Sequence, residues 1–397
     1  MTLEPARATY GDVFGIAEFR ALFVAYVASI LGDVVAAVAL TVLVFERTHS
    51  PLLAALTFSV AFLPFLFVGT LLTSVVDRLP ARRVLVACDL ASAAVVGVMA
   101  IPGLPLAAVF SLLVVLSLIG PLFSIVRAGT LPEVLGAGPV FVLGRSLLRL
   151  VAQLAQVLGN AVGGLLLIAF APRGVLLVDS GSFLVSAVVL RLGTPDRPRR
   201  AERSETSVVR DSLGGLRRVF SRRPLRRLLL FSWLVPACVA APEALAAPYT
   251  HSIGRSASAV GFFLIGLPAG VAAGDLVVAR FLRARRQRLI VTPAALLACA
   301  PLGLFLFSPG LVPAIALLVV SGIGFCYSPG LDQLLLRSAG DLQARALATS
   351  QAGLMFAQGI GFILWGAVAE LVSVRFVLAA AAVCGVAVVL LLRPAAE

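Results

Sequence analysis

The sequence predicts an all-α integral membrane protein with twelve transmembrane helices. Of its 397 residues, 60% are hydrophobic and 13% are charged, and the mean hydropathy is +1.06. Ordinary soluble domains carry about 25% charged residues, so that class is excluded. A helix needs about 20 apolar residues to cross a bilayer. Twelve runs of this kind follow one another, at roughly 19–45, 51–76, 83–101, 104–126, 142–170, 174–192, 226–250, 257–281, 289–307, 311–336, 345–370 and 374–393.

The arginines predict the orientation of these helices. All 32 basic residues are arginine, and the formal net charge is +13. With a cytoplasmic N-terminus, 28 of them lie on the cytoplasmic side, and the other four are Arg47, Arg173, Arg255 and Arg375. Cytoplasmic segments are enriched in basic residues. Both termini are therefore expected in the cytoplasm, and the charge indicates contact with a bilayer rather than with nucleic acid.

The longest polar segment divides the spans into two groups of six. We expect a cytoplasmic N-terminal tail over residues 1–18 and a first six-helix half over 19–192. An arginine-rich cytoplasmic linker follows at 193–225, then a second half at 226–393 and a cytoplasmic tail at 394–397.

The two halves carry signs of an internal repeat. Four residues of the fifth run recur in the eleventh, displaced by 202 positions: Ala155, Gln156, Gly159 and Gly164 reappear as Ala357, Gln358, Gly361 and Gly366. Weak internal repetition is expected of transporters in which two bundles rock about a central site. The pattern therefore predicts two pseudo-symmetric halves.

The loop between the second and third spans concentrates charge. Asp77, Arg78, Arg82 and Arg83 lie within seven residues, in the order Asp-Arg-x-Pro-x-Arg-Arg. Such density suits a tight turn at the membrane surface, where arginines face water and lipid phosphate. One interpretation is a gating loop, and the other is a basic turn that only fixes orientation.

This motif resembles the loop signature of the major facilitator superfamily. In that family a glycine precedes the Asp by four residues and another follows the Asp-Arg pair, where this chain has Thr73 and Pro80. The segments CDLAS around Asp89 and VDSGSFLVSAVVL around Asp179 are similar to the branch with the enterobactin exporter and macrolide-efflux proteins. The resemblance implies the major facilitator fold and an efflux activity.

The fifth run, AQVLGNAVGG, is similar to the family's antiporter motif. Gly159, Gly163 and Gly164 match it, and Asn160 replaces its proline. Small residues at this spacing let helix backbones approach closely. Arg149, Gln153, Gln156 and Asn160 recur every three or four residues, so they share one helix face. A polar stripe in a membrane helix is expected to face the bundle interior or a watery cavity.

Two acids inside apolar runs are candidates for proton coupling. Asp33 lies near the middle of the first span, and Glu243 lies in the seventh. A charged carboxylate at such depth costs about 2.5–3.5 kcal/mol on insertion scales. Burial also favours the neutral form of a carboxyl group, so proton uptake becomes feasible. The alternative is an acid paired permanently with an arginine or a backbone donor.

Asp89, Arg127 and Asp179 are expected to form intramembrane charge pairs, with Asp89 meeting Arg127. By resemblance to the family, the first, fourth, seventh and tenth helices line a substrate cavity. Their candidate lining side chains are largely aromatic, which suits a hydrophobic ligand: Phe23, Tyr26, Trp233, Phe325 and Tyr327.

The remaining motifs exclude several functions. Only His49 and His251 are available, and the five cysteines stand singly, so no metal site, disulfide or catalytic triad is predicted. The chain has no GxxxxGK[ST] stretch for ATP. We expect no cofactor and no enzyme activity.

The function predicted is export of a hydrophobic or amphipathic small molecule, such as a drug, secondary metabolite or siderophore, by proton antiport. A monomer in a bacterial cytoplasmic membrane is expected. The alternatives are a transport-inactive ligand sensor on the same scaffold and a nutrient importer.

The orientation can be tested by cysteine labelling of intact cells. Arg255→Cys is expected to react with a membrane-impermeant maleimide added outside, whereas Arg200→Cys is expected to react only after lysis, because the positive-inside rule places it in the cytoplasm. The parent protein gives the background from its native cysteines. The opposite labelling would invert the topology.

Overall fold

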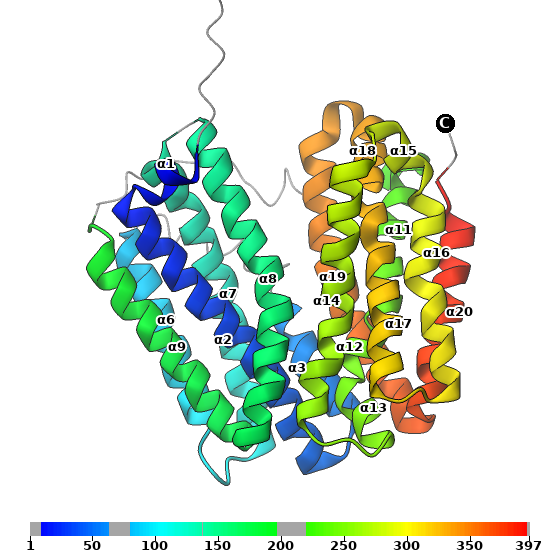
Figure 1. The fold of residues 1–397 in the computed structure, drawn as a ribbon, viewed down its shortest axis with the longest axis horizontal. Helices are drawn as coiled ribbons and strands as arrows, with labels where there is room; N and C mark the ends of the chain where they lie inside the picture. Colours follow the sequence, from blue (N-terminus) through cyan, green and yellow to red (C-terminus); the bar gives the residue numbers. More distant parts are fainter. Residues whose placement is uncertain (1–8, 63–79, 137, 197–219, 395–397) are drawn as a thin grey trace, which may run out of the picture. The chain divides into compact units, whose positions relative to one another are not determined.

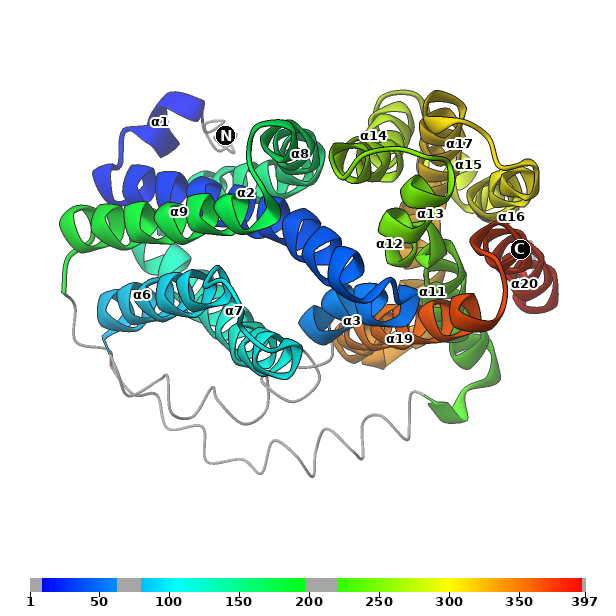
Figure 2. The same ribbon diagram turned by 90° about the horizontal axis from the view of Figure 1, so that it is seen from below.

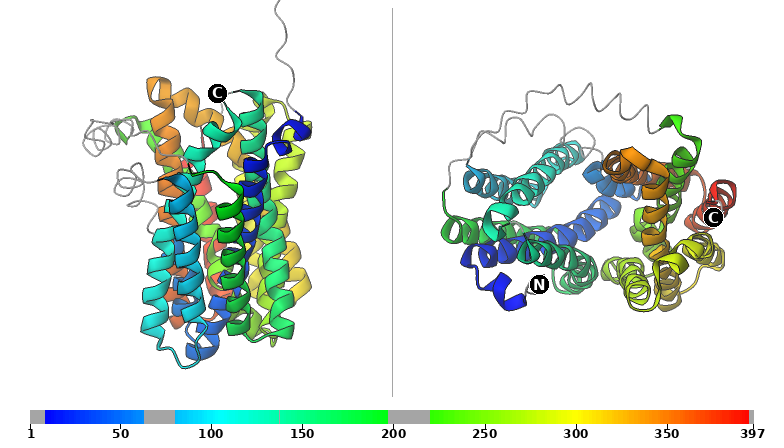
Figure 3. Two further views of the ribbon diagram at one scale, coloured as in Figure 1. Left: turned by 90° about the vertical axis from the view of Figure 1, so that its left-hand side faces the viewer. Right: turned by 90° about the horizontal axis from the view of Figure 1, so that it is seen from above.

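The computed structural model describes residues 9–62, 80–136, 138–196 and 220–394 (Figure 1), and in this part of the chain the regular elements are all helices. Two compact units are present. Unit 1 comprises Met1–Ala39 with Phe67–Ser204, and unit 2 comprises Leu40–Leu66 with Glu205–Glu397. Helix α2 (Ala17–Thr48) contributes to both. Within each unit the long helices run side by side along one direction (Figure 3).

Unit 1 is a bundle of long helices. Helix α6 packs against both α9 and α7 (Figure 2), and the short α1 lies against α8. Besides the first part of α2, the helices are α1 (Tyr10–Phe14), α6 (Ala81–Met99), α7 (Leu106–Leu135), α8 (Pro139–Ala169) and α9 (Pro172–Gly193).

Unit 2 is built from more and shorter elements. Its largest contacts join α14 to α17, α3 to α19 and α11 to α19. The helices are α3 (Pro51–Phe62), α11 (Arg223–Val239), α12 (Ala241–Ala244), α13 (Ala246–Ser252), α14 (Ser258–Phe281), α15 (Ala284–Leu289), α16 (Val291–Cys299), η1 (Ala300–Phe307), α17 (Leu311–Gly324), η2 (Phe325–Tyr327), α18 (Ser328–Ala339), η3 (Gly340–Leu342), α19 (Gln343–Leu371) and α20 (Val374–Leu392).

The helices account for the predicted spans. Nine helical segments of the described residues are long and apolar enough to cross a membrane. The remaining three runs correspond to α3, to α6, whose 19 residues include Arg82, Arg83 and Asp89, and to the short apolar stretch Val291–Phe307. The prediction of an all-α membrane protein is confirmed.

Several spans predicted as single helices are interrupted at prolines. The run 226–250 is divided into α11, α12 and α13, and it contains Pro236, Pro242 and Pro248. The tenth run changes to a 3-10 turn at Phe325–Tyr327, just before Pro329. Proline has no backbone N–H and clashes with the preceding turn, which favours a break nearby, although α7 continues through Pro121 and Pro132 and α14 through Pro268. In a membrane protein such breaks persist only where surrounding protein or water satisfies the backbone.

Segment Leu40–Leu66 clusters with unit 2 because α3 packs closely on α19. The Ser59 hydroxyl donates to the carbonyl of Gly359 at 2.8 Å, and a Cβ on Gly366 would lie 2.7 Å from the Cβ of Ala55. The six-helix halves at 19–192 and 226–393 remain a prediction from sequence, as do the tails and the linker, most of which lies outside the described residues.

The same glycine contact recurs in both units. A Cβ on Gly159 of α8 would lie 2.7 Å from the Cβ of Val34 on α2. A Cβ on Gly361 of α19 would lie 2.8 Å from the carbonyl oxygen of Ala237 on α11. The fifth span thus meets the first as the eleventh meets the seventh, which is the arrangement that the internal repeat predicts.

Helix α14 approaches α17 along three glycines spaced four apart. A Cβ would lie 2.7 Å from the Cβ of Leu318 at Gly266, 2.1 Å from the Val319 carbonyl oxygen at Gly270, and 2.7 Å from the Ile323 carbonyl oxygen at Gly274. Only glycine allows the backbones of α14 and α17 to lie this close. Any side chain would place its Cβ nearer to α17 than Cβ atoms approach other atoms in proteins. The predicted small-residue face of the eighth helix is therefore a helix-packing surface inside unit 2.

Replacement of Gly270 by valine is expected to lower the melting temperature in detergent. Its Cβ would collide with backbone of α17, and overpacking costs about 1–3 kcal/mol or more. Gly181→Ala is the matched control, because nothing lies within 4 Å of a Cβ at that helical position. Equal melting temperatures for the two variants would contradict the close contact.

Candidate transport site

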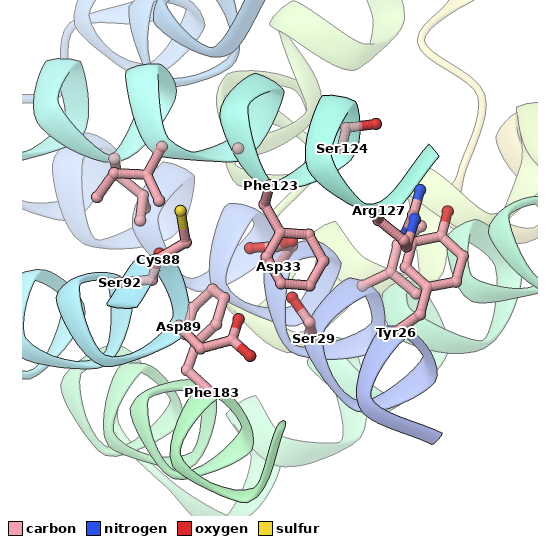
Figure 4. A pocket seen from close by; sticks show the side chains of 14 residues that line it. Tyr26, Ser29, Asp33, Cys88, Asp89, Ser92, Phe123, Ser124, Arg127 and Phe183 are labelled. Carbon is pink, nitrogen blue, oxygen red and sulfur yellow. The ribbon is translucent and has the colours of Figure 1, made fainter. Parts of the chain in front are cut away.

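Unit 1 contains a cavity of about 170 Å³ between α2, α6, α7 and α9 (Figure 4). This volume accommodates several water molecules. Helices α2, α6 and α7 each contribute residues three or four positions apart, so each presents one face to the cavity, and α9 contributes Phe183. Its lining is mixed polar and aromatic: Tyr26, Ser29, Ile30, Asp33, Cys88, Asp89, Ser92, Leu116, Ile119, Gly120, Phe123, Ser124, Arg127 and Phe183.

Asp33 is the acid of α2 that faces this cavity (Figure 4). Its side chain is exposed, and no hydrogen bond or ion pair to it is found among the residues that the structure describes. A carboxyl group in this position can exchange a proton with cavity water without first breaking a salt bridge. The Asp33 side chain therefore has the access to a cavity that proton coupling requires. Its role in proton coupling remains a prediction.

Arg127 lies against aromatic rings. Its guanidinium carbon is 3.5 Å from the centroid of the Tyr26 ring and 5.9 Å from that of Phe123. A cation over an aromatic face is stabilised by the ring quadrupole, by about 2 kcal/mol or more when it is desolvated. The predicted pair of Asp89 with Arg127 is not an ion pair in this structure, although both residues line the same cavity. That pairing stays a prediction.

Asp89 and Asp179 are held by serines of α9. The Ser186 hydroxyl donates to Oδ2 of Asp89, and the Ser182 hydroxyl donates to Oδ1 of Asp179 at 3.1 Å. Both acids are only 1% exposed. Asp179, Ser182 and Ser186 are three and four residues apart, so one face of α9 carries all three. The sequence did not lead us to predict this polar face, although the spacing of these three residues can be read from it.

Asp179 lies directly on the backbone of α2. A Cβ on Gly32 would lie 2.2 Å from Oδ1 of Asp179 and 2.2 Å from the Ser182 hydroxyl oxygen. The other carboxyl oxygen, Oδ2, is buried and has no hydrogen-bond partner among the described residues. An unpaired buried carboxylate is costly, whereas a protonated carboxyl is much less so. No ion pair to Asp179 is found among the described residues, and its predicted charge pair stays a prediction.

Glu243 lies in α12 of unit 2 and is half-buried. Helix α12 packs against α3 and α19. No hydrogen bond of its side chain is found in the described part of the chain. Its coupling role remains a prediction, and the interrupted helix around it matches what membrane transporters use near binding sites.

The charged loop is described only from Pro80 onward, so Asp77 and Arg78 lie outside the described residues. Arg82 and Arg83 both pair with Asp196, at 3.6 and 3.0 Å, and Arg82 also donates to the Thr194 carbonyl at 3.2 Å. These contacts join the start of α6 to the segment after α9. Asp196 was not among the predicted residues, and the signal for it is an acid standing alone among arginines just after the sixth span.

The residues of the predicted motif and polar stripe on the fifth span fall into two groups: those that pack against α2 or are buried, and those that are exposed. Gly159 and Gly163 contact Val34 and Val38 of α2, and Asn160 is buried. The other members of the polar stripe are exposed: Arg149, Gln153 and Gln156. The sealing role that the family resemblance implies for Gly159, Asn160, Gly163 and Gly164 remains a prediction.

Of the predicted cavity aromatics, Tyr26 lines the cavity of unit 1. Phe23 packs against Phe14 and Phe19 instead, with ring centroids 5.1 and 5.9 Å apart. Tyr327 is 2% exposed and stacks with Phe325. Trp233 donates its ring N–H to the Ser350 carbonyl at 3.0 Å. A common substrate cavity for the five remains a prediction.

The sequence profile of the Major Facilitator Superfamily matches residues 22–341. The chain belongs to the Major Facilitator Superfamily. It is 28% identical over 314 residues to the multidrug efflux pump Tap of Mycolicibacterium fortuitum, covering 75% of both chains.

Solved transporters share the fold. The crystal structure of the nucleoside transporter NupG superposes with a TM-score of 0.76 at 14% identity, covering 94% of this chain and 98% of that one. The peptide transporter POT in complex with sulfate superposes with a TM-score of 0.68 at 13% identity, covering 98% and 95%. The predicted fold and superfamily are therefore confirmed.

Removal of the Ser186 hydroxyl, which donates a hydrogen bond to Asp89, is expected to destabilise unit 1. Ser186→Ala leaves a buried carboxyl oxygen without its donor, which costs about 1–3 kcal/mol. Thermal melting in detergent measures the effect. Ser146→Ala is the control, because that exposed hydroxyl only donates back to the Val142 carbonyl of its own helix. A melting temperature that falls equally in both variants would contradict this role of Ser186.

Proposed function

We propose that this chain is a secondary transporter that exports a hydrophobic or amphipathic small molecule in exchange for protons across a bacterial cytoplasmic membrane. The observation that carries the proposal is the cavity in which Asp33 lies beside aromatic side chains. Aromatic walls suit an apolar ligand, and a few polar groups orient it. The proposed driving force is an ion gradient, and the substrate's own gradient is the alternative, since no ATP-binding loop of the GxxxxGK[ST] type occurs in the sequence.

The proton-coupling part of the proposal is supported by the state of the interior acids. No ion pair to Asp33, Asp89 or Asp179 is found among the described residues. Carboxyl groups without a fixed cation change charge by gaining or losing a proton, which makes them sensitive to a proton gradient. Asp33 is the proposed carrier, with Glu243 as the candidate in unit 2. We take both termini as cytoplasmic and the protein as a monomer.

The efflux direction is supported by the 28% identity to a multidrug efflux pump. Drugs and secondary metabolites are the proposed substrate class, and a siderophore is included because of the enterobactin-exporter resemblance. The fold also serves nucleoside and peptide transporters. The competing functions are therefore nutrient import and ligand sensing without transport.

Neutralising Asp33 is expected to abolish proton-driven transport. In inside-out vesicles, Asp33→Asn is expected to reduce uptake of a lipophilic fluorescent drug driven by a pH gradient to the level of empty vesicles. Binding of the same drug in detergent is expected to remain measurable, because the amide keeps the shape of the carboxyl group and loses only the titrating proton.

The matched control is Asp12→Asn, which changes an exposed acid that caps α1 through Thr9. It is expected to transport normally. Coupled transport at the normal rate in Asp33→Asn would remove Asp33 from the mechanism. Drug susceptibility of a pump-deficient strain separates the functions, because export raises resistance whereas import or sensing does not.

A further inference from the structure

The two histidines of the chain lie together at one end of unit 2. His49 follows α2 and His251 lies in α13, and the centroids of their imidazole rings are 6.0 Å apart. The sequence contains only these two histidines, separated by about 200 positions. Both side chains are exposed. Their proximity is produced by the fold and is not visible in the sequence.

A buried phenylalanine positions both rings. Phe45, which is 8% exposed, lies edge-on to His49 with centroids 6.0 Å apart and to His251 with centroids 5.6 Å apart. Edge-to-face contacts of this kind restrict how aromatic rings turn. The two imidazoles are therefore held near one another rather than left to rotate independently in solvent.

His49 is also held in an unusual backbone conformation. Its φ is +52°, and its N–H donates to the carbonyl of Phe45 at 2.7 Å, which ends α2. Glycine or asparagine is the usual residue at such a left-handed helix end. A residue with a side chain costs about 1–2 kcal/mol there. This conformation turns the chain so that the imidazole lies beside His251.

The spacing of the rings matches what a shared metal ion requires. Zinc binds imidazole nitrogen at about 2.0–2.1 Å, so two imidazoles on one ion place their centroids about 5–6 Å apart. The observed separation of 6.0 Å lies at the upper end of this range. Imidazole prefers zinc, copper and nickel over magnesium or calcium.

We propose that His49 and His251 bind one divalent transition-metal ion of the Zn²⁺, Ni²⁺ or Cu²⁺ class. Among the described residues, no group of three or more His, Cys, Asp or Glu side chains is arranged to hold a metal. In this proposal water completes the coordination, and the ion exchanges with its surroundings. The bound ion joins the end of α2 to α13. With the orientation predicted from the arginines, this end faces the outside of the cell.

The test uses the full-length protein without a histidine tag, titrated with ZnCl₂ in detergent by calorimetry. One ion per chain is expected, with a higher melting temperature as the ion concentration rises above the dissociation constant. Because two linked ligands bind far more tightly than one, His251→Ala is expected to weaken binding by about 100-fold. With Cu²⁺ in place of Zn²⁺, paramagnetic resonance is expected to show two coupled imidazole nitrogens.

His49→Gly separates loss of the site from loss of the fold. Glycine suits the left-handed position better than histidine, so this variant is expected to melt no lower than the parent while losing Zn²⁺ binding to the same extent as His251→Ala. Ser308→Gly is the matched control, because Ser308 is also left-handed, at φ +49°, and lies outside the pair. It is expected to bind Zn²⁺ normally.

Two results would overturn the proposal. One is unchanged Zn²⁺ binding in the double variant His49→Gly/His251→Ala, and the other is a paramagnetic resonance spectrum with a single coupled nitrogen.

Discussion

The architecture depends on the absence of water from hydrocarbon, which obliges every backbone N–H and C=O group to find a partner within the protein. Helices meet this demand residue by residue, and the described elements are all helical. The same demand explains why the proline-interrupted stretch around α12 lies against α3 and α19 rather than facing lipid. Packing replaces the hydrophobic effect as the force between helices, so glycines that permit backbone contact become the main determinants of how α14 meets α17.

Against this apolar background the interior acids of unit 1 are distinguished by their surroundings. Asp33 faces a cavity, Asp89 accepts a hydrogen bond from Ser186, and Asp179 is buried with one oxygen unpartnered. The cation nearest to this cavity, Arg127, lies over Tyr26. Positive charge is thus held by an aromatic ring rather than by a carboxylate. This division suits the proton exchange proposed above more than a static ion-pair network does.

Composition and the lengths of the apolar runs predicted most of the fold, because span length is a property of the chain itself. The runs at 257–281 and 374–393 match α14 and α20 to within a residue. Site residues were predicted less completely. Asp33 was named as a lone acid in an apolar run, and Tyr26 as an aromatic residue of a helix that lines the cavity in the family it resembles. Asp196 and the serines of α9 were not, because their importance depends on which helices become neighbours. The meeting of His49 and His251 likewise follows only from three-dimensional packing.

The contact at Gly32 restricts how the gene for this protein can change. Every single-nucleotide substitution that alters a glycine codon and still encodes an amino acid introduces a side chain, and any side chain here would collide with Asp179 and Ser182. Replacement of Gly32 therefore requires that the side chains of Asp179 and Ser182 turn aside, which would disturb the hydrogen bond between them. Substitutions in these two helices are thus coupled through one missing methyl group.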